Sequence, residues 1–134
     1  LNLNGSTGAG ATTLSGNNAV GVLNISSVGT NVTLTNLTIQ NGLAAFGGGI
    51  FNNGSNLVIL NSTFSGNRAV GANGVDGSNL GAGGGGGGGA GLGGAIFSTG
   101  GTVTIDNSIF SGNQAIGGNG GAGFPNNGAF DGIG

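Results

Sequence analysis

The 134-residue chain contains no cysteine, methionine, tryptophan, tyrosine or histidine, and it has only one basic and three acidic residues. Without cysteine there can be no disulfides, thiolate nucleophiles or soft-metal sites. The single basic residue, Arg68, provides no positive patch for a phosphate backbone, so we expect no nucleic-acid partner. No apolar run approaches the roughly 20 residues that cross a bilayer, which argues against a membrane span.

Glycine is the residue the chain has most of, with 37 copies. Glycine loses the most conformational freedom on folding, so an ordered chain of this composition needs repetitive backbone hydrogen bonding and close stacking. A sheet wound on itself supplies both. The chain begins at Leu1, already within a strand-like pattern, and we expect it to be a processed product or a part of something longer.

The chain repeats itself. Gly-Gly-Gly-Ile-Phe at 47–51 recurs as Gly-Gly-Ala-Ile-Phe at 93–97, which is 46 residues later, and earlier copies precede the first at steps of 25 residues. Because 46 exceeds 25 by 21, the last step contains an insertion of 21 residues, which we place as a glycine-rich loop within 71–92. The glycine-rich tail at 117–134 begins in the same way as the insertion.

Apolar and polar residues alternate within each unit, as a strand requires. Three short strands per 25 residues, with Gly and Asn at the corners, predict an all-β fold: a right-handed parallel β-helix (a solenoid) of about four coils, with 1–134 as one segment. Equivalent side chains of stacked coils then form columns. We expect interior columns Ile25-Ile50-Ile96, Val32-Leu57-Val103, Leu34-Ile59-Ile105 and Leu14-Ile39-Phe64-Phe110, and a corner ladder of Asn36, Asn61 and Asn107.

Two motifs carry a family resemblance. The Gly-Gly-Ala-Ile at 93–96, its variant at 47–50 and the Phe-x-x-Asn pairs at 64–67 and 110–113 resemble the paired motifs of chlamydial polymorphic outer-membrane proteins. The Asn-Ser-Thr-Phe-Ser-Gly-Asn at 61–67, repeated with Ile at 107–113, resembles pectate-lyase-like β-helix repeat proteins of cyanobacteria, Chloroflexi and related bacteria. The resemblance implies the β-helix fold and a cell-surface or secreted location, and it leaves the activity open.

The acidic residues do not favour an enzyme or a metal site. Glycoside hydrolysis normally needs two carboxylates flanking the bond, and no pair is visible among Asp76 in the insertion, Asp106 on an outward strand position and Asp131 in the tail. Residues 71–76 resemble a single, imperfect copy of a calcium-binding nonapeptide, but one carboxylate is far short of a calcium ligand set. We therefore expect no catalytic residue and no cofactor, with calcium as the alternative.

Apolar residues at outward strand positions suggest that the chain associates with another molecule. Val58 and Leu60 are adjacent apolar side chains on the outer face of one strand, and the glycine-rich insertion or a neighbouring molecule is expected to cover them. The strand edges at the ends of the stack favour self-association or continuation into further coils. We therefore expect an extracellular or cell-surface structural or adhesive protein, with cell-surface polysaccharide as a further partner. The alternative is a carbohydrate-binding or carbohydrate-cleaving module whose site lies in coils outside this chain.

Overall fold

The computed structural model of the protein describes residues 1–7, 11–77 and 84–123. Within these ranges the chain is all-β, which confirms the predicted class: 14 strands form four sheets, and every strand pair is parallel. The same ranges contain no helix that is long and apolar enough to cross a membrane.

The four sheets are named A to D. Sheet A consists, in spatial order, of β1 (Asn2–Asn4), β4 (Asn31–Thr35), β8 (Asn56–Leu60) and β12 (Val103–Asp106). Sheet B consists of β2 (Thr12–Ser15), β5 (Leu37–Gln40), β9 (Thr63–Ser65) and β13 (Ile109–Ser111). Sheet C consists of β3 (Leu23–Ile25), β7 (Ile50–Asn52) and β11 (Ile96–Ser98). Sheet D consists of β6 (Leu43–Ala44), β10 (Arg68–Val70) and β14 (Gln114–Ile116).

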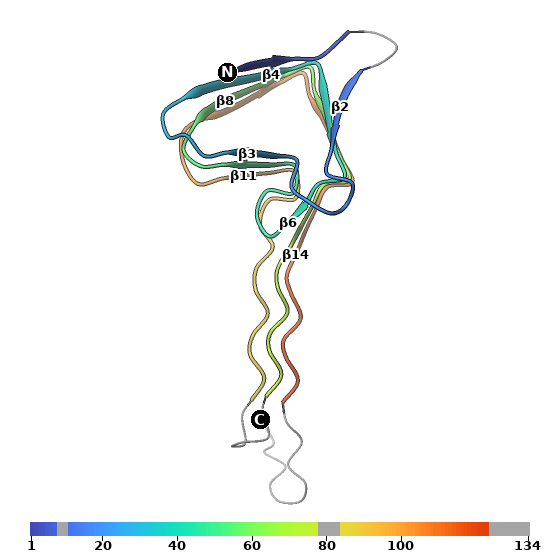
Figure 1. Ribbon diagram of the computed structural model, residues 1–134, viewed down its shortest axis with the longest axis vertical. Coiled ribbons are helices and arrows are strands. Elements are labelled where there is room, and N and C mark those ends of the chain that lie inside the picture. Colours follow the sequence, from blue (N-terminus) through green and yellow to red (C-terminus); the bar gives the residue numbers. More distant parts are fainter. Residues whose placement is uncertain (8–10, 78–83, 124–134) are drawn as a thin grey trace, which may run out of the picture.

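The first pass runs from sheet A through sheet B to sheet C, without a strand in sheet D. The next two passes visit sheets A, B, D and C in turn, and the last one in the described residues ends in sheet D (Figure 1). Three strands per repeat were predicted, and the structure has a fourth, in sheet D. Sequence patterning misses this strand because β6 has only two residues and β10 begins with the exposed Arg68.

The register in sheets A and B follows the repeat. Val32 lies beside Leu57, which lies beside Val103, and Leu34, Ile59 and Ile105 form the next row. In sheet B the row runs through Leu14, Ile39, Phe64 and Phe110. These rows point inward, where burial of apolar area stabilises the stack. The buried apolar core comprises Val32, Leu34, Leu37, Ile39, Ile50, Leu57, Ile59, Phe64 and Ala69.

The predicted column through Ile25 is wrong at its first member. In sheet C, Ile50 pairs with Leu23 and Ile96, whereas Ile25 pairs with Asn52. The segment between β3 and β4 covers residues 26–30, and the matching segment between β7 and β8 covers only 53–55. The segment after β3 is thus two residues longer than its counterpart, and the segment before β3 is two residues shorter than its counterpart. Because the two differences cancel, the repeat keeps its period of 25 although β3 itself is shifted by two residues.

The Gly-Gly-x-Ile motifs lead the chain into sheet C, from sheet D at 47–50 and from the inserted segment at 93–96. Gly47 and Gly93 have φ of 61° and 66°, a left-handed backbone that glycine adopts at little cost. The next residue packs backbone against backbone: a Cβ on Gly48 would lie 2.4 Å from the carbonyl oxygen of Arg68, and one on Gly94 would lie 2.3 Å from that of Gln114. The motif therefore permits a turn and a close approach that larger residues would block.

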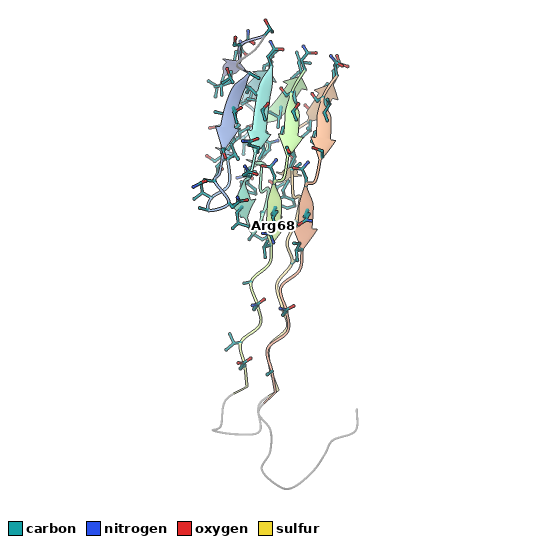
Figure 2. All side chains as sticks on the ribbon, turned by 90° about the vertical axis from the view of Figure 1, so that its right-hand side faces the viewer. Arg68 is labelled. Atoms are coloured by element: carbon teal, nitrogen blue, oxygen red, sulfur yellow. The ribbon has the colours of Figure 1, made fainter. Side chains whose placement is uncertain are left out.

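The glycine-rich segments leave the sheets together. Residues 71–77 (rod 1), 84–91 (rod 2) and 117–123 (rod 3) extend side by side beyond sheet D (Figures 1 and 2). The Gly71 N–H donates to the carbonyl of Ile116 at the end of β14, at 2.9 Å, and rod 1 continues with bonds to rod 3 from the N–H groups of Gly74 (2.7 Å) and Gly77 (2.8 Å). A donor at every third residue is the period of a polyproline II helix. We call the three rods the glycine bundle.

The hydrogen bonds of the glycine bundle form a closed ring. Rod 3 donates to rod 2, from Gly118 to the Gly89 carbonyl and from Gly121 to the Gly86 carbonyl, both at 2.8 Å. Rod 2 donates to rod 1 in turn, from its Gly86 and Gly89 N–H groups to the carbonyls of Val75 (2.8 Å) and Ala72 (2.7 Å). Rods 1 and 3 run parallel and rod 2 runs against them. The inserted segment and the start of the tail, predicted as a separate loop and tail, are therefore one unit; residues 78–83 and 124–134 lie outside the described ranges.

Every third glycine of the bundle faces its axis. A Cβ on Gly85 would lie 2.0 Å from the carbonyl oxygen of Gly121, and one on Gly88 would lie 2.0 Å from that of Gly118. A Cβ on Gly84 or Gly87 would meet no atom within 4 Å. Only glycine fits at the axial positions, for the reason that collagen needs glycine at every third residue.

Candidate functional site

The outer face of sheet C carries an aromatic row that sequence analysis missed. Phe51 and Phe97 lie on neighbouring strands and point outward, with ring centroids 5.9 Å apart. Phe46, before the turn into β7, stacks on Phe97 at 5.5 Å and 30°. Its partner in a single β-bridge is Leu92, at the end of the insertion. We call Phe46, Phe51 and Phe97 the aromatic platform; Phe46 remains 47% exposed.

A pocket of about 390 Å³ lies beside the aromatic platform. Its walls include Phe46, Phe51, Leu23 and Asn24, and the remaining walls are glycine and alanine, with no charged side chain. This volume falls within the range of ligand sites, which are mostly apolar with a few polar groups. Asn24 occupies the same outward row as Phe51 and Phe97, one pass earlier, and supplies the polar side chain.

A polar row follows the aromatic one along sheet C. Asn53 and Thr99 come directly after β7 and β11 and are both exposed. The Thr99 hydroxyl donates to the Asn53 side-chain oxygen at 2.9 Å, which holds both groups in place. Phenyl rings and neutral hydrogen-bonding groups therefore lie side by side on this face.

The asparagines predicted at a corner lie between sheets A and B. Asn36, Asn61 and Asn107 have φ of 56°, 48° and 45°, a left-handed conformation that asparagine tolerates well at turns. The Asn107 side chain donates to that of Asn61 at 2.7 Å, and Asn36 donates to Asn4 at 3.2 Å. The amides of this corner therefore bond in pairs between neighbouring passes, a structural use of the polar groups.

A second asparagine ladder lies inside the stack, at the corner between sheets B and D. Asn67 is fully buried; its amide donates to the carbonyl of Ile39 and to the side chain of Asn113, both at 2.9 Å, and its oxygen accepts the N–H of Gly42 at 2.9 Å. The repeated Ser-Gly-Asn at 65–67 and 111–113 was the available sequence signal. These side chains satisfy corner backbone groups that the sheets leave unpaired.

Val58 and Leu60 lie on the outer face of β8, as a half-buried pair between two threonines of β4 on one side and Thr104 and Asp106 of β12 on the other. The described parts of the insertion do not cover them: rods 1 and 2 extend from the side of sheet D, away from sheet A (Figure 1). The expectation that the insertion shields this pair is therefore wrong for 71–77 and 84–92.

The charged side chains are scattered. Arg68 is exposed on β10, on the outer side of sheet D (Figure 2), and Asp106 is exposed at the end of β12 in sheet A. Asp76 lies in rod 1, where its carboxylate accepts the N–H of Ala122 at 2.7 Å. The described residues contain no group of three or more His, Cys, Asp or Glu that could hold a metal ion; Asp131 lies outside them.

Comparison of the chain with protein-family models, with curated proteins and with solved structures finds no match. The functional interpretation therefore rests on the geometry of this chain.

Proposed function

We propose that the four sheets are the faces of a right-handed parallel β-helix, and that the chain serves as an extracellular structural or adhesive scaffold extended by coil stacking. The support for the architecture is the pass-by-pass register. Residues one pass apart lie side by side at offsets of 25 and 46, both in the strands and in side-chain hydrogen bonds such as Thr30 to Ser55 and Asn67 to Asn113.

The observation that carries the scaffold role is the apolar edge of the last pass. Leu57 and Phe64 in the middle of the stack are fully buried, whereas their row partners Val103 and Phe110 are 37% and 42% exposed. One more coil placed on β12 and β13 would pair their outer backbone groups and bury these side chains. The coil can belong to the same polypeptide or to another copy.

The scarcity of reactive side chains supports the same proposal. Among the described residues the three charged side chains, Arg68, Asp76 and Asp106, belong to sheet D, rod 1 and sheet A respectively. We therefore assign no catalytic residue. The neutral amides of the outer corner bond in pairs between neighbouring passes, Asn107 to Asn61 and Asn36 to Asn4, which is a stabilising role along a stack.

Sedimentation velocity over a wide range of concentration tests the proposal. The chain should form elongated assemblies, and Phe110→Asp should abolish them because it buries a charge in the next interior column. Ile109→Asp is the matched control: Ile109 is the preceding residue and points outward, 64% exposed. A chain that stays monomeric at millimolar concentration, or equal effects of the two variants, would overturn the proposal.

A further inference from the structure

The aromatic platform is the part of the outer surface whose chemistry the scaffold role leaves unexplained. An outward phenyl ring on one pass is unremarkable, since apolar atoms cover much of any protein surface. Here three rings from two passes stack on one another beside a pocket, and Phe46 keeps nearly half its surface exposed. Solvent-facing rings held in this way point to a ligand.

The electrostatics of the face narrow the ligand class. No charged side chain lines the pocket, so nothing there would compensate the desolvation of a charged ligand. The polar groups are the Asn24 amide at the pocket and the Asn53 and Thr99 pair after the strands. Such groups both donate and accept, as hydroxyl-rich ligands require.

The outward side chains of sheet C also repeat from one pass to the next. Asn24, Phe51 and Phe97 occupy one row on three adjacent parallel strands, spaced by about 4.8 Å from pass to pass. A polymeric ligand lying along this row would meet an amide and then two phenyl rings at successive steps. A pyranose ring has an apolar C–H face and an equatorial rim of hydroxyls, and the electron-rich ring faces favour positively polarised C–H groups.

From these observations we propose that the aromatic platform binds a neutral polysaccharide, with sugar faces packed on Phe46 and Phe97 and hydroxyls bonded to Asn24, Asn53 and Thr99. The site lies within this chain and does not depend on coil stacking, so it goes beyond the scaffold role. An adhesive role would then have a defined ligand, a neutral polysaccharide.

Affinity electrophoresis through gels containing hydroxyethyl cellulose, amylose or polygalacturonate tests the site. The intact chain should be retarded by at least one of the two neutral polymers and not by the acidic one. Phe46→Ala should weaken the retardation about tenfold, since a bound sugar loses one of the two rings on which it packs. Ile109→Ala removes an apolar group that is also exposed but lies on sheet B, and it should leave retardation unchanged.

Three results would overturn the proposal: no retardation by either neutral polymer, stronger retardation by polygalacturonate, or equal losses for Phe46→Ala and Ile109→Ala. Sedimentation of Phe46→Ala separates this site from the scaffold role. The variant should assemble as the unchanged chain does, whereas a failure of assembly without loss of retardation would count against coil stacking alone.

Discussion

The sheet stack and the glycine bundle share a register but are held together by different forces. Both place residues 46 apart side by side: Phe64 lies beside Phe110 in the stack, and Asn73 bonds to Asn119 in the bundle. In the stack the interior is filled by side chains, and the rings of Phe64 and Phe110 are parallel, with centroids 4.7 Å apart. In the bundle the axis is filled by backbone.

The difference shows two ways for a repetitive chain to become ordered. The stack gains stability by burying apolar area, so its register is specified by which side chains are large. The bundle has no apolar interior, and the side chain of Val75 points to solvent at 80% exposure. Its register is specified by where side chains are absent, because axial carbonyls approach every third glycine.

The largest effect should come from the centre of the stack. Phe64→Ala removes a fully buried ring and should lower the free energy of unfolding by about 3 to 5 kcal/mol, measured by denaturant titration. Ile109→Ala, on the outer face of the neighbouring strand, should change it by less than about 0.5 kcal/mol. A loss below about 1 kcal/mol for Phe64→Ala would mean that apolar columns do not hold the stack.

A smaller loss should follow removal of the buried amide. Asn67→Ala leaves the N–H of Gly42 and the carbonyl of Ile39 without their partner, at a cost of about 1 to 3 kcal/mol in the same titration. Asn53→Ala is the control, because that amide is exposed and should cost less than about 0.5 kcal/mol. Equal values for the two variants would show that the inner ladder is not needed at the corner.

The smallest effect on global stability should come from a substitution in the glycine bundle. This variant also distinguishes the bundle from the sheet stack most clearly. Gly88→Ala places a Cβ 2.0 Å from the Gly118 carbonyl oxygen, so the rods should part and the amide hydrogens of Gly89 and Gly118 should exchange roughly tenfold faster. The unfolding midpoint of the stack should hardly move. Gly87→Ala, one residue earlier, faces open space and should leave exchange unchanged. Identical exchange in both variants would contradict the axial role of Gly88.

Sequence patterning predicts those parts of the fold that carry large side chains. The rows through Leu57 and Phe64 lie where their apolar alternation places them, because a slip of one residue would turn each row to solvent. The prediction that Ile25 lies beside Ile50 was wrong, because the connecting segments before and after β3 differ in length by opposite amounts and leave the period of 25 unchanged. Sheet D was missed because β6 has only two residues and β10 begins with the exposed Arg68, which hides the alternation.

The bundle and the aromatic platform escaped prediction for different reasons. Residues 71–77 have glycine at every third position, but the uninterrupted run at 83–89 hides which glycines face the axis. The aromatic platform joins Phe46, which lies between β6 and β7, to Phe97 on β11, one pass later. Spacing along one strand cannot reveal such a pair.

Fibre diffraction from aligned assemblies of the intact chain tests the scaffold account most directly. If coils stack end to end, the pattern should show a strong reflection near 4.8 Å along the fibre axis, because each added coil continues the strand spacing of the four sheets. Assemblies whose 4.8 Å reflection lies across the fibre axis, or a solution in which no assemblies form at all, would contradict it.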